Sequence, residues 1–307
     1  MSGVMDERQL FEIEAPSPVS LADKFGVPPM SVLDCRTGDW QDRKRRWLSL
    51  GMESEVGRAD DLLYTRATAT DPVSLKLLDA GGTSIFDPVL CELAYRWHTL
   101  PGDRILDPFA GGSVRGIVAS TLARWYVGVD LRGEQIEANE AQAHLGSDIA
   151  PRWIQGDSVR LSDHLDPADE FDLVFSCPPY ADLEVYSDNP RDLSRMPYEE
   201  FREAHARIIA AATARLQNDR FAAWVISDVR DKRGAYRGLV VDTIRAFEAA
   251  GLSFHNDAVI LNATATAGLR AERPFRATRK LTRVHQHLLI FVKGDAKRAA
   301  TRLEDAA

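Results

Sequence analysis

Two consecutive prolines, Pro178 and Pro179, stand at the end of an apolar run over 172–176. Each proline sets φ at about −65° and removes a backbone N–H donor, so a β-strand has to end there. Tyr180 follows directly and places an aromatic ring at the carboxyl end of that strand. Open α/β sheets bind their ligands at this edge. The pattern therefore predicts a buried strand that ends in a ligand-binding turn.

A second strand ends in unusual backbone chemistry about 70 residues earlier. Asp107 closes the run 104–106, and Gly111 and Gly112 form a turn into a helix, with Ser113 as the expected N-cap. Glycine lets a backbone approach a ligand closely, and the helix N-terminus supplies free N–H donors. This turn is therefore a second candidate ligand contact.

Strands and helices alternate from residue 84 onward, which predicts a doubly wound, mostly parallel α/β sheet. The expected strands cover 104–106, 126–130, 152–155, 172–176, 222–226, 254–261 and 284–292. The expected helices cover 88–97, 113–125, 133–145, 197–216 and 239–250. The last two strands have no helix between them, so they predict an antiparallel hairpin at or near one edge. We expect an N-terminal extension over 1–80, a catalytic domain over 81–295 and a polar tail over 296–307.

The composition is that of a soluble globular protein: 307 residues, 45% hydrophobic, 27% charged and a net charge of −8. Cys35, Cys91 and Cys177 form an odd set without metal-type spacing, which favours a reducing cytoplasm and no metal site. The first residues are acidic and polar, so no signal peptide is expected. No apolar run reaches the ~20 residues of a membrane helix. The oligomeric state stays open.

The segments Leu106–Gly112 and Phe175–Tyr180 resemble the DPFxG and (D/N/S)PP(Y/F/W) motifs of S-adenosylmethionine-dependent DNA amino-methyltransferases, the N4-cytosine and N6-adenine methylases. Residues 27–47 are similar to a segment found in phage and actinobacterial methylases of this type. The resemblance implies a seven-stranded Rossmann-like methyltransferase sheet, S-adenosylmethionine as cofactor and DNA as partner, with or without a cognate restriction enzyme. One departure is the turn, which reads Gly111-Gly112-Ser113 where the family commonly has GxG.

Asp130 ends the second strand roughly 20 residues after the glycine turn, where an acidic residue accepts the ribose hydroxyls of an adenosyl group. Asp157 ends the third strand and is expected to accept from the adenine amino group. The GxGxxG fingerprint of nicotinamide enzymes is absent. The residues expected to form the cofactor site are Phe86, Asp107, Phe109, Gly111, Gly112, Asp130 and Asp157.

The resemblance also implies the reaction centre, which comprises Ser176, Cys177, Pro178, Pro179 and Tyr180. Family members hold an exocyclic amine with two acceptors, a side chain and the first proline's carbonyl, while the aromatic ring stacks on a flipped base. Cys177 occupies the side-chain acceptor position, and a thiol is a weak acceptor. Three arrangements stay open: Cys177 serves as a poor substitute for serine, Ser176 helps it, or the carbonyl of Pro178 does most of the work. Cysteine is closer in size to serine than to aspartate, which slightly favours N4 of cytosine over N6 of adenine.

Three alternatives stay open. Cys177 could be the nucleophile of a C5-cytosine-type enzyme, although in that class the cysteine follows the proline instead of preceding it. The substrate could be RNA or another amine on the same fold. The weak acceptor would also suit a non-catalytic module that binds cofactor and DNA.

A basic segment lies between the last two expected strands, in a predicted loop over 264–282. We expect this loop to hold nucleic acid phosphates. The basic residues are Arg270, Arg273, Arg276, Arg279 and Lys280 within the loop, and Arg283 directly after it. A second cluster, 43–46, is consistent with an ordinary solvated surface. His285 and His287 share a face of the last strand, but no carboxylate or cysteine nearby suggests a metal.

Overall fold

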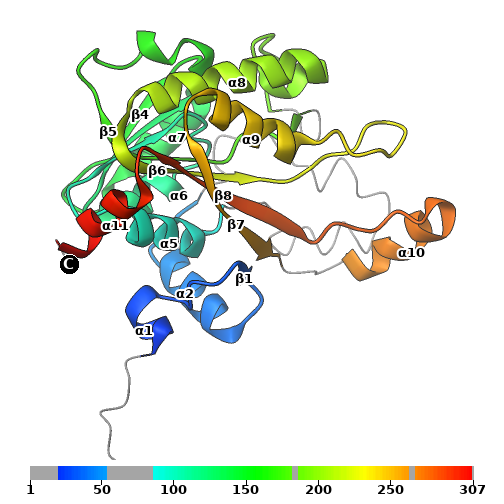
Figure 1. Ribbon diagram of the computed structural model, residues 1–307, viewed down its shortest axis with the longest axis horizontal. Helices are drawn as coiled ribbons and strands as arrows, with labels where there is room; N and C mark the ends of the chain where they lie inside the picture. The colour runs from blue at the N-terminus through cyan, green and yellow to red at the C-terminus, as the bar shows by residue number, and fades with distance from the viewer. Residues whose placement is uncertain (1–19, 54–85, 182–185, 263–266, 306–307) are drawn as a thin grey trace, which may run out of the picture. The chain divides into compact units, whose positions relative to one another are not determined.

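The computed structural model describes residues 20–53, 86–181, 186–262 and 267–305 (Figure 1). The chain divides into two compact units, Met1–Met30 and Ser31–Ala307. The described part of the first unit holds one short helix, α1 (Leu21–Phe25). Ser20 caps this helix, because its side chain accepts a hydrogen bond from the Asp23 N–H.

The second unit is built on one eight-stranded sheet with the order β1-β7-β8-β6-β5-β2-β3-β4. The strands are β1 (Val32–Asp34), β2 (Arg104–Asp107), β3 (Trp125–Asp130), β4 (Arg152–Gln155), β5 (Phe171–Ser176), β6 (Leu216–Ile226), β7 (Ser253–Leu261) and β8 (His285–Lys293). Neighbouring strands are parallel except where β8 pairs with β6 and β7. The expected doubly wound, Rossmann-like sheet with an antiparallel C-terminal pair is confirmed, with eight strands in place of seven.

The eighth strand comes from the N-terminal extension. β1 lies parallel to the edge strand β7, where the Val259 N–H donates to the Ser31 carbonyl at 2.8 Å and the Cys35 N–H to the Leu261 carbonyl at 3.1 Å. Leu33 is buried in this pairing. Three residues between turns are too short for an alternation of polar and apolar positions to be visible in the sequence.

Helix α2 (Gly38–Leu48) follows β1 and packs on α5 (Pro88–His98). Arg43 forms a two-pronged ion pair with Glu92, with both nitrogen–oxygen distances 2.8 Å. The Trp47 indole donates to Glu92 at 2.8 Å, and Lys44 lies 3.2 Å from Asp87. At least two residues of the basic cluster 43–46 are therefore committed to the fold.

Helices cover both faces of the sheet (Figure 1). One face carries α5 with α6 (Val114–Thr121), and the other carries α8 (Tyr198–Ala214) with α9 (Leu239–Ala249). Helix α7 (Gly133–Ala141) packs on β3 and β4. The Phe247 ring of α9 stacks on the Phe291 ring of β8 with centroids 4.0 Å apart, and both are fully buried. A sheet buried on both faces explains why β5 is apolar almost throughout.

Several expected boundaries were wrong. The helix expected over 113–125 ends at Thr121, since Ala123 has a positive φ of 60° and turns the chain into β3. The loop expected over 264–282 contains helix α10 (Ala267–Thr278). The polar tail is helix α11 (Ala296–Asp305), in which Arg302 pairs with Asp103 at 2.8 Å. Ion pairs hold α11 in place, and its polar composition concealed it.

None of the helices in the described part of the chain combines the length and the hydrophobicity that a membrane span requires.

Candidate active site

The two strand-end motifs lie side by side. β2 and β5 are parallel neighbours, with Ile105 opposite Leu173 and Leu106 opposite Val174. On its other side β2 pairs with β3. The chain therefore continues from β2 to β3 and β4 on one side, and then crosses over to place β5 on the opposite side of β2. This is the point at which strand order reverses and where such sheets bind ligands. The fold thus brings together motifs that are far apart in the sequence.

Asp107 connects the two motifs through its fully buried carboxylate. Oδ1 accepts from the Phe109 N–H at 3.0 Å and from the Ser176 hydroxyl at 2.5 Å. Oδ2 accepts from Arg115 Nε at 2.5 Å and from the Tyr126 hydroxyl at 2.7 Å. Four donors therefore satisfy this carboxylate from inside the protein, and it supports the turn instead of reaching out to a ligand.

Arg115, on the first turn of α6, is the partner that the sequence did not reveal. Its side chain is 5% exposed. Nη2 donates to the Ala110 carbonyl at 2.9 Å and also to the Phe109 carbonyl, and the guanidinium lies 4.6 Å from the centre of the Phe86 ring. Burial acts to lower the pKa of Arg115, but Asp107 outweighs it and raises that pKa above its usual value. Arg115 is thus a permanent cation that holds the turn 108–111 and Phe86.

Gly111 has the left-handed φ of +52° that favours glycine, whereas Gly112 is not among the positive-φ residues. The Gly111 N–H donates to Asp130 Oδ2 at 2.9 Å, and its carbonyl accepts from Asn139 Nδ2 at 2.7 Å. Asn139 is fully buried on α7. The glycine required by the turn is therefore Gly111. Ser113 occupies the expected N-cap position but makes no side-chain capping bond.

Asp130 lies at the carboxyl end of β3, beside the turn. Its Oδ1 accepts from the Arg132 N–H at 3.0 Å, and 16% of its side chain is exposed. Each oxygen accepts one backbone N–H, so each keeps a free lone pair for a ligand hydroxyl. Burial raises the pKa of this carboxyl, while Arg132 acts against the rise. A carboxylate of this kind fits a ribose diol.

The remaining expected cofactor residues surround this turn in different ways. Phe86 is half-buried and packs edge-on against Phe175 at 5.8 Å. Phe109 packs against the core residue Trp224 with ring centroids 5.9 Å apart. Asp157 caps the 3₁₀ turn 158–163 by accepting from the Val159 N–H at 3.0 Å through Oδ1, and its Oδ2 lies 3.9 Å from Arg191 Nη1. Phe109 therefore belongs to the core as much as to the site.

The proline motif presents Cys177 and Tyr180 at the end of β5. Both residues are half-buried, and Cys177 Sγ lies 3.5 Å from Tyr180 Oη. Pro178 is buried and Pro179 half-buried. Ala181 follows with a φ of +51°, a conformation that costs a non-glycine residue ~1–3 kcal/mol and that clusters at functional sites.

Ser176 is fully buried and its hydroxyl is committed to Asp107. The hydroxyl proton is used by Asp107 while the oxygen keeps its lone pairs, so an acceptor role for Ser176 stays a prediction beside Cys177 and the Pro178 carbonyl. The other two cysteines are buried, and burial raises the pKa of Cys35 to about 12 and that of Cys91 well above its ordinary value. Cys177 is thus the cysteine placed at the site.

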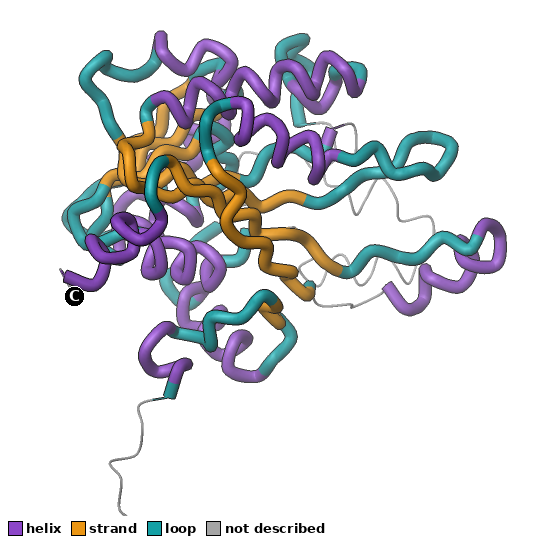
Figure 2. The backbone as a smooth tube through the Cα atoms, in the orientation of Figure 1, coloured by secondary structure: helices purple, strands orange, loops and turns teal. Residues whose placement is uncertain are grey.

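The basic segment between β7 and β8 extends from the sheet edge at which β5 and β6 end (Figure 2). Arg273 and Arg276 lie on α10, where Arg276 pairs with Glu272 at 2.8 Å. Arg279 lies 5.3 Å from the Phe275 ring, which is 43% exposed. Lys280 is exposed and Arg283 half-buried, while the side chain of Arg270 lies outside the described residues.

The histidines of β8 have local partners. His287 lies 3.0 Å from Asp257, and His285 lies 3.2 Å from Arg283. Across the described residues, no group of three or more His, Cys, Asp or Glu side chains is arranged to hold a metal ion. Asp228, at the end of β6, accepts from the N–H groups of Gly238 and Leu239 and so caps α9.

No family model and no curated protein matches the sequence. Solved structures with similar folds include TrmN from Thermus thermophilus, with 17% identity over 74% of this chain and 55% of that one and a TM-score of 0.47. Another is magnesium protoporphyrin IX methyltransferase from Synechocystis PCC 6803 with bound S-adenosylmethionine, with 13% identity, 81% and 90% coverage and a TM-score of 0.44. The [4+2]-cyclase SpnF is a third, with 14% identity, 68% and 82% coverage and a TM-score of 0.44. The chain spans about half the length of TrmN.

Proposed function

We propose that the protein is an S-adenosylmethionine-dependent methyltransferase that methylates an exocyclic amine of a DNA base. The observation that carries the proposal is the junction of the two motifs. The glycine turn follows β2, Asp130 ends β3, and the proline motif with Tyr180 follows β5. These three strands are neighbours in the sheet, in the order β5-β2-β3. A methyl donor on the first motif would therefore meet a base on the second.

The residues present fit the cofactor. Asp130 has lone pairs for the ribose hydroxyls, and Gly111 opens the backbone. Asp157 Oδ2, which lies 3.9 Å from Arg191 Nη1, would accept from an adenine amino group. When bound, S-adenosylmethionine supplies an electrophilic methyl group on its sulfonium. Asp107 and Arg115 preorganise this side of the site from beneath, because they hold the turn 108–111 without pointing at the ligand.

The proline motif supplies the acceptor side. An exocyclic amine is a poor nucleophile because its lone pair is delocalised into the ring. An acceptor that draws on an N–H bond shifts electron density back to the nitrogen before it attacks. Pro178 offers a carbonyl just beyond the end of β5, and the Cys177 thiol offers a weaker second acceptor. Tyr180 stacks on the base.

DNA is favoured over other substrates that carry an amine. The reason is that the basic segment 267–283, which includes an exposed aromatic ring, extends from the same edge of the sheet (Figure 2). N4 of cytosine is slightly favoured over N6 of adenine by the size of Cys177. Transfer of labelled methyl groups to duplex DNA, total RNA and protein, compared under identical conditions, tests the proposal. Labelling of RNA or protein alone would overturn the choice of DNA.

Cys177→Ser is expected to retain or increase methyl transfer, since a hydroxyl accepts hydrogen bonds better than a thiol. The measurement is the steady-state rate on duplex DNA, together with denaturing electrophoresis of the enzyme after incubation with DNA that contains 5-fluorocytosine. No covalent complex should form. Loss of turnover in Cys177→Ser together with a trapped complex would identify Cys177 as a nucleophile and replace amino methylation with C5 chemistry.

Tyr180→Ala is expected to lower kcat/KM for DNA by about tenfold to hundredfold, because stacking on a base contributes ~1–3 kcal/mol. Tyr180→Phe is the matched control: it keeps the ring and removes only the hydroxyl that faces Cys177. The phenylalanine variant should stay close to the wild type, and both variants should bind the cofactor normally. Equal losses in the two variants would show that the hydroxyl, not the ring face, is what matters.

A further inference from the structure

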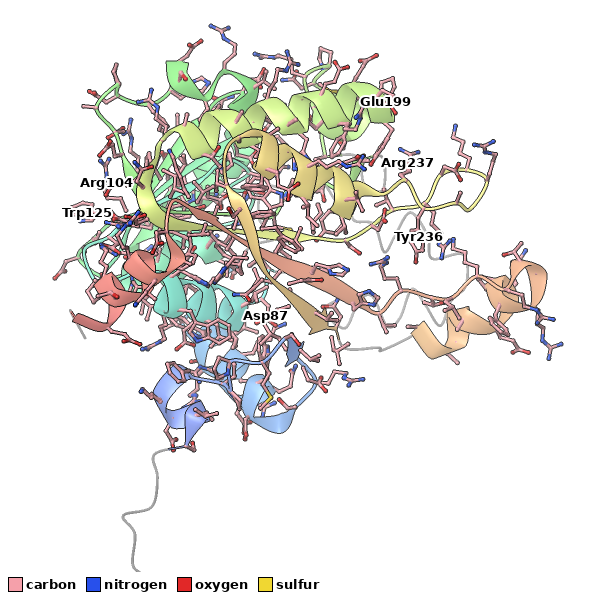
Figure 3. The ribbon with its side chains drawn as sticks, in the orientation of Figure 1. Asp87, Arg104, Trp125, Glu199, Tyr236 and Arg237 are labelled. Atoms are coloured by element: carbon pink, nitrogen blue, oxygen red, sulfur yellow. The ribbon has the colours of Figure 1, made fainter. Side chains whose placement is uncertain are left out.

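Residues 227–238 form a hairpin that links β6 to α9. Arg230 and Tyr236 form an isolated antiparallel bridge across it, and the Asp231 N–H donates to the Ala235 carbonyl at 2.8 Å. The Arg237 N–H closes its base by donating to the Val229 carbonyl at 2.9 Å. These bonds make the segment an ordered hairpin, and it extends from the sheet beside the chain that leads from α10 into β8 (Figures 1 and 3).

Tyr236 lies opposite Arg230 in this hairpin, and its ring contacts two arginines from different segments of the chain. The guanidinium carbon of Arg230 lies 3.6 Å from the centre of the Tyr236 ring, and that of Arg283 lies 4.9 Å from it. Arg283 directly precedes β8, so the ring connects the hairpin to the basic segment. The Tyr236 side chain remains 45% exposed.

No carboxylate balances this pair of cations in the described part of the chain. Arg230 donates to the Gly234 carbonyl at 2.7 Å, and Arg283 faces His285 Nε2 at 3.2 Å. Burial and Arg283 lower the pKa of His285, so this neighbour is neutral at physiological pH. The nearby Asp231 is occupied by Arg233 and by the Ala235 N–H. Arg283 Nε is buried without a hydrogen-bond partner. Two half-buried guanidiniums without a carboxylate partner, one of them with an unused donor, form a place that favours an anion.

We propose that Arg230, Tyr236 and Arg283 form a phosphate-binding site for the nucleic acid backbone next to the target base. The proposal rests on the proposed function and adds where the substrate strand is held. Trp224 of β6 is in register with Ser176 of β5, so the hairpin and the proline motif leave the sheet at the same edge. Planar guanidiniums match phosphate oxygens in pairs, and the tyrosine ring fixes their orientation.

The test measures duplex DNA affinity against salt for Arg230→Gln, Arg283→Gln and the double variant. The slope of log K against log salt is negative, and each lost phosphate contact should make it less steep by about 0.9, or by about twice that in the double variant. Arg298→Gln is the matched control. It also removes one positive charge, but Arg298 pairs with Asp219 near the other end of β6. Its slope should equal that of the wild type. Normal cofactor binding by every variant would confirm that the fold is intact.

Slopes for Arg230→Gln and Arg283→Gln that equal the wild-type slope would overturn the phosphate site while leaving DNA as the substrate. Absence of DNA binding by the wild type, with methyl transfer to another amine, would instead overturn the proposed function itself. Tyr236→Ala distinguishes an oriented site from charge alone. It keeps both arginines, yet it should weaken DNA binding about tenfold if the ring holds them in place, whereas unchanged affinity would contradict the site as described.

Discussion

Arg115→Leu is expected to lower the free energy of unfolding by ~3–5 kcal/mol, which is the cost of breaking a buried ion pair by removing one partner. The substitution leaves the Asp107 carboxylate buried and charged, with only the Ser176 and Tyr126 hydroxyls and one backbone N–H to compensate it. It also frees the Phe109 and Ala110 carbonyls, which Arg115 now satisfies. Urea unfolding followed by circular dichroism measures the loss.

Two comparison variants make this result interpretable. Arg298→Ala removes an exposed pair with Asp219 and should cost at most about 1 kcal/mol. The double variant Asp107→Asn/Arg115→Leu removes both charges, so its loss should be smaller than the sum of the two single losses. Additive losses, or a loss in Arg115→Leu no larger than that in Arg298→Ala, would show that the Asp107–Arg115 ion pair does not stabilise the fold in this way.

Asp130→Ala is expected to abolish detectable S-adenosylmethionine binding at concentrations that saturate the wild type. Two hydrogen bonds from ribose hydroxyls to a charged acceptor contribute ~1.5–3 kcal/mol each. The variant also removes the acceptor for the Gly111 N–H, so the glycine turn loses a constraint. Isothermal titration calorimetry with the cofactor measures the effect independently of turnover.

Asp130→Asn separates the two contributions, because the amide keeps one oxygen and nearly the same shape. Its cofactor affinity should lie between those of Asp130→Ala and the wild type. Asp163→Ala removes a surface carboxylate that pairs with the exposed Arg160, and it should bind the cofactor as the wild type does. Wild-type affinity in Asp130→Ala would mean that the cofactor site lies elsewhere on the sheet.

Much of the fold follows from local sequence chemistry. The strand over 152–155 matches β4, and the proline pair ends β5 where expected. The helix expected over 239–250 matches α9, and Gly251 ends it with a φ of +87°. In each of these cases the deciding interaction lies within a few residues along the chain. Glycine and proline act on their own backbone, and alternating strands and helices bury their apolar sides in only a few ways.

Other features depend on partners that are distant in sequence. The sequence by itself determined the doubly wound sheet, the two motifs at its strand ends and the aspartate after the second strand. Only the tertiary structure decided that Asp107 supports the site from beneath, that the Ser176 hydroxyl donates to it, and that Arg115 pairs with it. It also added β1 to the sheet and joined Tyr236 to Arg230 and Arg283. The reason is physical: strand ends and turns are local properties of the backbone, whereas the partner of a polar side chain is set by which strands become neighbours.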